Sequence, residues 1–173
     1  MKKNLSVREL VLMAFYVALF MVLDTFVNTL PFFQMPNGGS LGLSTIPLLM
    51  ASYQLGWQKG LVVSIVSVFA QFATGPMYTP DLLGFLLDYL IAFSVYGLAC
   101  LFPNFGWFDS GVLITNVIRF LSSTISGCVV WGLLPLPSAA YNATYMVPTL
   151  LLDLVLVPLL LKALAPLMNK ARA

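Results

Sequence analysis

The sequence predicts an all-α membrane protein in which six transmembrane helices form a single domain over residues 1–173. The first observation behind this prediction is composition: 60% of the 173 residues are hydrophobic and only 8% are charged. A soluble domain carries about 25% charged residues, so this chain has too few to cover a water-exposed surface. The second is that the apolar residues gather in six segments, and about 20 apolar residues cross a bilayer as a helix.

The six expected helices cover residues 7–30, 41–56, 60–75, 82–102, 111–133 and 145–168. The first is longer than the apolar region of a signal peptide and has no small-residue cleavage site after it, so we interpret it as a membrane helix. The second and third are short and span only about 24 Å at 1.5 Å per residue. We expect these two helices to be sheltered by their neighbours, or to end partway across the membrane.

Lysine and arginine determine the expected orientation, because they are enriched in cytoplasmic connections. If both termini are cytoplasmic, the cations outside the helix interiors all lie inside: Lys2, Lys3, Arg8, Lys59, Lys162, Lys170 and Arg172. The three connections that would face outward, 31–40, 76–81 and 134–144, contain no lysine or arginine. The chain is therefore predicted to be a multi-pass cell-membrane protein with both termini in the cytoplasm.

Several function classes are disfavoured by what the sequence lacks. There is no histidine, which removes the commonest general base and metal ligand, and both cysteines lie in apolar runs. We therefore expect no metal site, no disulfide and no cofactor. The net charge of +2 gives no indication of nucleic-acid binding, and no P-loop motif indicates an ATPase. A membrane-embedded enzyme and a small channel or assembly factor stay as alternatives to a ligand-binding protein.

Four ionisable residues fall inside the expected helices: Asp24, Asp88, Arg119 and Asp153. Each costs about 2.5–3.5 kcal/mol at the centre of a membrane helix, so such residues normally face the bundle interior and have a partner. At helical rise, the backbones of Asp88 and Arg119 differ in depth by about 8 Å, which an extended arginine can bridge. Two interpretations are open: an ion pair that locks two helices together, or an Asp88 that is partly free to bind a cationic ligand. Asp24 and Asp153 receive no functional role.

The fifth expected helix carries a pattern of period four: Arg119, Ser123, Gly127 and Trp131. Residues four apart lie on one slowly drifting face of a helix. With further hydroxyls at 122, 124 and 126, this helix has too many polar groups to face lipid all round. Gly127 serves either for close helix packing or to leave room for a flat ring. In the first helix, Ala14 and Ala18 are also four apart, a spacing that lets another helix approach closely.

Six short stretches form a recognisable set: residues 39–47, 55–60, 74–78, 85–89, 126–131 and 141–148. With these stretches, its length and its six expected helices, nearly the whole chain resembles the S components of energy-coupling factor (ECF) vitamin transporters, and most closely the thiamine-specific ones. The resemblance implies an S-component-type bundle that binds thiamine from the outside. It also implies two kinds of partner, a transmembrane coupling (T) component and a pair of cytoplasmic ATPases that supply the energy.

The resemblance further implies roles for individual residues. The ligand-binding positions of the family fall on Asp88, Tyr89, Tyr78, Gly127, Trp131, Asn142 and Arg119. Ala14 and Ala18 match the small-residue motif by which S components dock on their membrane partner.

The chain also departs from the family pattern. Ser123 stands where the thiamine binders have a histidine, and Asp88 stands where they usually have the longer glutamate. Pro137 replaces a tyrosine, for which Tyr141 is the expected substitute, and an aromatic residue is missing at 37–39. These departures leave the transporter class intact but leave the ligand open: thiamine, another vitamin, or a pyrimidine-type precursor.

Overall fold

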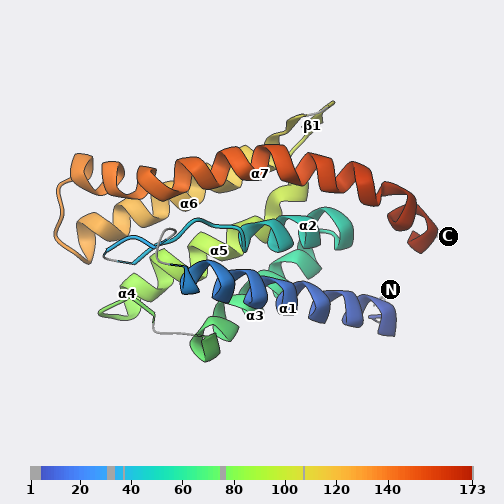
Figure 1. Ribbon diagram of the computed structural model, residues 1–173, viewed down its shortest axis with the longest axis horizontal. Helices are drawn as coiled ribbons and strands as arrows, with labels where there is room; N and C mark the ends of the chain where they lie inside the picture. Colours follow the sequence, from blue (N-terminus) through green and yellow to red (C-terminus); the bar gives the residue numbers. More distant parts are fainter. Residues whose placement is uncertain (1–4, 31–33, 37, 75–76, 107, 173) are drawn as a thin grey trace.

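The computed structural model describes residues 5–30, 34–36, 38–74, 77–106 and 108–172, with side chains in the last helix described as far as Pro166. Within these ranges the chain is helical apart from short connections and one small hairpin (Figure 1). The helices are α1 (Val7–Thr29), α2 (Thr45–Leu55), α3 (Trp57–Thr74), α4 (Leu82–Phe85), η2 (Leu86–Ile91), α5 (Ala92–Ser94), η3 (Val95–Leu101), α6 (Ser110–Val129) and α7 (Pro135–Arg172). Strands β1 (Asn104–Phe105) and β2 (Phe108–Asp109) form the antiparallel hairpin. Because α4, η2, α5 and η3 continue one another, each of the six predicted helices has a counterpart, and the all-α class is confirmed.

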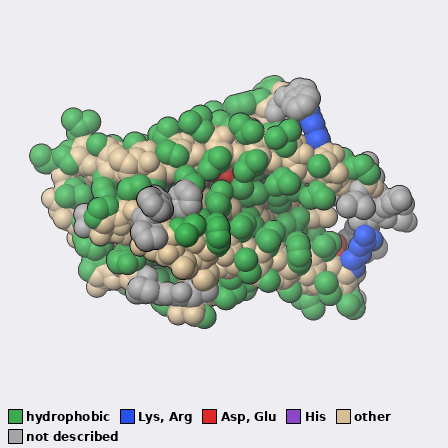
Figure 2. Space-filling model, viewed as in Figure 1, with side chains coloured by type: hydrophobic (Ala, Val, Ile, Leu, Met, Phe, Trp, Pro, Cys, Tyr) green, Lys and Arg blue, Asp and Glu red, His purple; other side chains and the backbone are tan. Residues whose placement is uncertain are grey.

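The surface of the molecule is that of a membrane protein. In the part of the chain that the structure describes, four helical stretches are long and apolar enough to cross a membrane: Val7–Thr29, Leu82–Leu101, Ser110–Val129 and Pro135–Pro166. Figure 2 shows hydrophobic side chains spread over one face, with lysine and arginine only at one end. The start of α1 and the end of α7 lie at that same end (Figure 1). Both termini therefore lie on one side, and the cytoplasmic orientation of that side stays a prediction.

Helix α1 lies at the periphery of the bundle. Its first turn is closed by a capping box, in which the side chains of Ser6 and Glu9 each accept a hydrogen bond from the other residue's backbone N–H. Glu9 also forms a salt bridge with Lys59 of α3. Most of α1 is exposed, and its buried residues are Tyr16, Phe20 and Val27. Such a helix is suited to contact lipid or another protein.

Helix α2 is the buried centre of the fold. All eight residues from Thr45 to Ser52 are buried, and the helix packs against α1, α3, η3 and α7. A non-helical segment, 38–44, leads into it, and Gly56, with φ of 85°, ends it. The expectation of a short helix sheltered by its neighbours is therefore confirmed. The backbone of the non-helical segment before α2 is mostly covered by protein. Such a segment is therefore tolerated within the bundle.

The helix from Leu82 to Leu101 is irregular at the position of Asp88. Asp81 caps its start by accepting a hydrogen bond of 2.7 Å from the backbone N–H of Gly84. The chain then widens into the π-helical turn η2, Leu86–Ile91, which includes Asp88 and Tyr89. Single π-helical turns inside helices frequently mark functional sites, because they re-aim side chains out of α-helical register.

The prediction for the last helix was wrong at its start. We expected the connection 134–144 and a helix from 145, whereas α7 begins at Pro135. Proline at a first helical position is pre-set for helical φ and needs no N–H partner there, so it starts the helix rather than preventing it. Of the polar residues that suggested a loop, Ser138 and Asn142 are buried in the bundle, whereas Thr144 is exposed. The preceding helix α6 ends at Val129, so Trp131 lies just beyond it.

Candidate ligand-binding cavity

A cavity of about 680 Å³ lies between α1, η2, α6 and α7, closed by the segment 38–40 and by Met77 and Tyr78. The α6–α7 connection and α4 lie at the end of the molecule opposite the termini (Figure 1). All nine residues predicted to bind ligand line this cavity: Tyr78, Asp88, Tyr89, Arg119, Ser123, Gly127, Trp131, Tyr141 and Asn142. Ala14 and Ala18, predicted for docking, lie elsewhere, exposed on α1.

In the described part of the chain, hydroxyls of α6 hold Asp88, namely those of Ser126 and Ser123. Its carboxylate accepts a hydrogen bond of 2.5 Å from the hydroxyl of Ser126 on α6. One turn earlier on α6, the hydroxyl of Ser122 donates to the backbone carbonyl of Leu87 at 2.6 Å. These two bonds fix the π-helical turn against α6 and orient the carboxylate at the cavity wall. Asp88 therefore keeps acceptor positions that Ser126 and Ser123 do not occupy.

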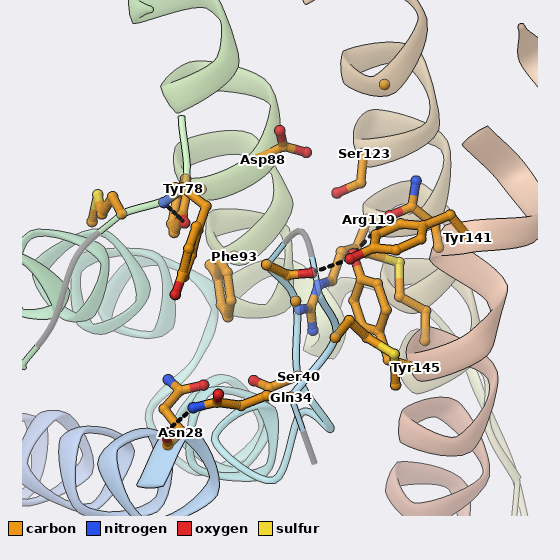
Figure 3. Close-up of a pocket in the computed structure, with 18 of the residues that line it drawn as sticks. Asn28, Gln34, Ser40, Tyr78, Asp88, Phe93, Arg119, Ser123, Tyr141 and Tyr145 are labelled. Atoms are coloured by element: carbon orange, nitrogen blue, oxygen red, sulfur yellow. Dashed lines mark hydrogen bonds between the residues drawn. The ribbon is translucent and has the colours of Figure 1, made fainter. Parts of the chain in front are cut away.

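Arg119 lies in the cavity wall without an acidic partner. Its guanidinium stacks over the ring of Phe93, 4.5 Å from the centroid, and Nη1 donates to the Tyr96 hydroxyl at 3.3 Å. Within the described residues, the salt bridge found is that between Lys59 and Glu9, so the ion pair between Asp88 and Arg119 does not form. The two side chains instead bond to different partners, Ser126 and Tyr96, and Figure 3 shows Asp88, Ser123 and Arg119 around the same cavity.

These contacts do not satisfy all the donors of Arg119. Arg119 is 7% exposed, and its Nε has no hydrogen-bond partner among the residues that the structure describes. A buried donor without a partner is costly. A ligand with a hydrogen-bond acceptor would remove that cost.

A chain of hydrogen bonds continues from Arg119 into the core. The Tyr96 hydroxyl donates to Oδ1 of Asn116 at 2.8 Å, and Nδ2 of Asn116 donates to Asp153 at 3.0 Å. The Thr45 hydroxyl lies 2.9 and 3.0 Å from the two oxygens of Asp153. Asp153, fully buried, thus joins α2, α6 and α7 beneath the cavity. This network accounts for an intramembrane carboxylate that the sequence left unexplained.

Tyrosines hold the segment that covers the cavity. The Tyr141 hydroxyl donates to the carbonyl of Gly38 at 2.6 Å. A Cβ on Gly38 would lie 2.9 Å from the Tyr78 side chain, and one on Gly39 would lie 2.8 Å from the Tyr145 ring. Both glycines also have φ near 90°, which other residues rarely adopt. The pair therefore fits between two tyrosine rings only because it has no side chains.

Gly127 is needed for helix packing. A Cβ at this position would lie 2.0 Å from Oγ of Ser138 on α7, and the Ser138 hydroxyl donates to the carbonyl of Thr124 on α6. Of the two uses left open for Gly127, close packing is the one seen, although the residue also lines the cavity. Asn142 is buried beside it and accepts a hydrogen bond of 2.6 Å from the Tyr145 hydroxyl.

Sequence reasoning missed a part of the cavity wall. Its unpredicted residues include Asp24, Asn28, Gln34, Gln71, Phe93 and Tyr145. Asp24 and Asn28 are one helical turn apart on an otherwise apolar helix, which is a signal that could have identified them. Phe93 and Tyr145 resemble ordinary core aromatics in the sequence, and only the fold shows that they contact the cavity.

The charges of the wall do not cancel. Two carboxylates, Asp24 and Asp88, and one guanidinium, Arg119, line the cavity, so its formal charge is −2 + 1 = −1. In a low-dielectric surrounding, an uncompensated negative charge attracts a cation strongly. Among the described residues no group of three or more Asp, Glu, Cys or His side chains is arranged to hold a metal ion. The arrangement is therefore suited to an organic cation with flat rings.

Comparisons with known proteins agree with this chemistry. A family model described as "Thiamine transporter protein" (Thia_YuaJ) matches residues 10–169. A curated relative, the thiamine transporter ThiT of Bacillus subtilis (strain 168), is 28% identical over 163 residues, which cover 82% of this chain and 85% of that protein. The family match spans every element that lines the cavity.

Proposed function

The chain belongs to the thiamine transporter protein family, and on that premise we propose that it is the substrate-capture (S) subunit of an ECF-type importer. As a member of this family it is a membrane transporter for thiamine and not an enzyme. The finer proposal is that it binds thiamine from the outside and delivers it through a shared, ATP-driven module. The observation that carries it is that Asp88 forms no salt bridge with any described residue and lies in a cavity with aromatic walls.

The cavity and thiamine are complementary in charge and shape. Thiamine carries a permanently positive thiazolium ring joined to an aminopyrimidine, and a carboxylate can bind the cation or accept hydrogen bonds from the amine. Tyr78, Tyr89 and Trp131 can stack on such rings, and each cation–π contact contributes about 0.5–2 kcal/mol. The volume of about 680 Å³ lies in the usual range for ligand pockets, roughly 300–1,000 Å³.

The alternative ligand is a neutral heterocycle such as a thiamine precursor. Ser123 in place of the expected histidine leaves the wall beside Asp88 with a small hydroxyl, which by itself does not select for charge. The formal charge of −1 in the cavity favours a cation over a neutral ring. Thiamine is therefore the preferred ligand. Comparing the affinity for thiamine with the affinity for the precursor tests this preference.

Partners must supply the energy for transport, since the sequence has no P-loop motif. Ala14 and Ala18 are both exposed on α1, where small residues four apart permit close approach of a second helix. We assign this face to docking on the T component, with two ATPases on the cytoplasmic side. The cavity would then face outward, because it lies far from the termini.

Ligand recognition can be tested by tryptophan fluorescence, since Trp131 lines the cavity. Thiamine titrated into the detergent-solubilised protein should change the emission at submicromolar concentration, and riboflavin or biotin should not compete. Asp88→Asn should weaken the binding of thiamine at least tenfold, or by about 1.4 kcal/mol. It should weaken the binding of the neutral aminopyrimidine precursor less. If the binding of both compounds were weakened equally, charge recognition by Asp88 would be ruled out.

Docking can be tested separately. Ala14→Trp should leave thiamine binding by the purified protein unchanged while abolishing uptake into cells that contain the energising module. The matched control is Leu151→Trp, which places the same ring at an exposed position of α7 and should leave uptake intact. Normal uptake by Ala14→Trp would refute the docking role.

A further inference from the structure

Asp24 is a second carboxylate of the cavity wall, and nothing above assigns it a role. It lies on α1 with Thr25, Asn28 and Thr29, which line the same side of the cavity. Its oxygens accept hydrogen bonds from the Asn28 amide at 3.1 Å and the Ser44 hydroxyl at 3.3 Å. Over the described ranges no lysine or arginine lies within salt-bridge distance of Asp24.

Packing does not explain this carboxylate. A charged residue in a membrane helix costs about 2.5–3.5 kcal/mol and is normally paired. Among the residues that the structure describes, Asp24 accepts from two neutral donors, the second at a long distance, although a carboxylate has about four acceptor positions. Asp153, by contrast, is fully enclosed by its partners. The free positions of Asp24 are thus available to a molecule in the cavity.

The two ends of the cavity differ in chemistry. Figure 3 shows Asn28, one turn beyond Asp24, on the opposite side of the cavity from Asp88, with Phe93 and Arg119 between them. The Asp88 end is aromatic, with Tyr89 and Trp131 in its wall. The α1 wall consists of one carboxylate, one amide and two hydroxyls, without a ring.

We propose that the Asp24 side of the cavity is the subsite for the non-aromatic, alcohol-bearing end of the ligand, and that its charge rejects the phosphate ester of that alcohol. For thiamine, whose binding is the proposed function on which this inference rests, the group is the hydroxyethyl substituent of the thiazolium ring. The alcohol donates a charge-assisted hydrogen bond to the Asp24 carboxylate. A phosphate in the same place would set like charges together in a low-dielectric surrounding.

Arg119, which lines the same cavity, offsets that repulsion only in part. Its guanidinium is buried, stacked on Phe93 and held by the Tyr96 hydroxyl. The formal charge of the whole wall stays at −1 with Arg119 included, so a phosphate ester entering the cavity meets net repulsion. Asp24 is accordingly a specificity residue for the free alcohol.

The test compares three compounds on the full-length protein in detergent: thiamine, thiamine monophosphate, and the analogue with ethyl in place of hydroxyethyl. Wild-type protein should bind thiamine at least tenfold more tightly than either of the others, a difference of about 1.4 kcal/mol. Asp24→Asn should reduce the preference over the monophosphate at least tenfold, and should bind thiamine and the ethyl analogue within about threefold of each other. Asp24→Glu, which keeps the charge, should keep the rejection of the monophosphate.

The control is Asp109→Asn, the same chemical change at a carboxylate that does not line the cavity; it should alter none of the ratios. Wild-type protein that binds the monophosphate or the ethyl analogue as tightly as thiamine would overturn the inference without any variant. So would an Asp24→Asn protein with unchanged ratios. Wild-type protein that binds no thiamine at all would instead refute the proposed function, and the two failures are thus distinguishable.

Discussion

Replacing Asp153 by asparagine should leave the protein nearly as stable as the wild type, whereas replacing it by alanine should cost about 2–4 kcal/mol. The position is suited to such a comparison because Asp153 is fully buried and both of its donors are known. They are the Thr45 hydroxyl and the Asn116 amide. Asparagine keeps a hydrogen-bond acceptor at position 153 but removes the charge, whereas alanine removes both. The comparison therefore shows which of the two the fold requires.

The magnitude follows from the alternative partners of each donor. The Thr45 hydroxyl lies 2.5 Å from the carbonyl of Gly42, so alanine at 153 leaves it satisfied. The Asn116 amide bonds the Val112 carbonyl with one proton, and its second proton would lose its acceptor at about 1–3 kcal/mol. The space left by the carboxylate adds roughly another 1 kcal/mol.

Asparagine avoids both costs. Its carbonyl oxygen can accept from Asn116, and its amide can donate to the Thr45 oxygen, whose proton then turns to the Gly42 carbonyl. We therefore expect a change below about 1 kcal/mol, the size of a single rearranged neutral hydrogen bond.

Thermal unfolding in detergent, followed by tryptophan fluorescence, measures the difference. For a chain of this length 1 kcal/mol corresponds to about 2–4 °C, so Asp153→Ala should lower the midpoint by roughly 5–15 °C. Asp153→Asn should lower it by only a few degrees. If asparagine were as damaging as alanine, the reasoning would fail, because the charge of Asp153, opposite Arg119 across Tyr96 and Asn116, would then be what stabilises the bundle.

Three further outcomes are expected. Gly127→Ala should lower the unfolding midpoint by several degrees and weaken thiamine binding, because the new methyl group would lie 2.0 Å from Oγ of Ser138 and push α6 from α7. Ser126→Ala should weaken thiamine binding about threefold to tenfold in a fluorescence titration, since it removes the bond that orients Asp88; unchanged binding would show that Ser126 does not position that carboxylate. Glu9→Gln should leave the midpoint nearly unchanged at low and high salt, because an ion pair that is still accessible to solvent contributes little.

The sequence was informative wherever chemistry and periodicity coincide. Arg119, Ser123 and Gly127 were predicted to share a face because they recur every four residues, and the structure places them in one cavity wall. The six helices followed from apolar runs in a chain with few charges. The interaction partners of the charged side chains could not be predicted in this way. Depth alone does not decide whether Arg119 turns toward Asp88 or toward the rings of Phe93 and Tyr96.

The start of α7 shows the other limit. Proline, serine, tyrosine and asparagine between 135 and 142 have the composition of a loop, and in a soluble protein they would favour one. Here Ser138, Tyr141 and Asn142 face a polar cavity, so a helix can hold them without contacting lipid. Knowing that the cavity existed was necessary to recognise the helix, and residue patterns within one segment cannot supply that knowledge.

The wide turn at Leu86–Ile91 makes the helix that contains it sensitive to its own length. A π-helical turn holds one residue more than an α-helical one, so removing a single residue there would let the helix close into regular α geometry. The flanking parts would then rotate against each other by about 100°, the angle of one residue. Either the lipid-facing side chains after the turn would point inward, or the carboxylate at 88 would leave the wall. We therefore expect insertions and deletions within these six residues to be far more damaging than substitutions of the same residues.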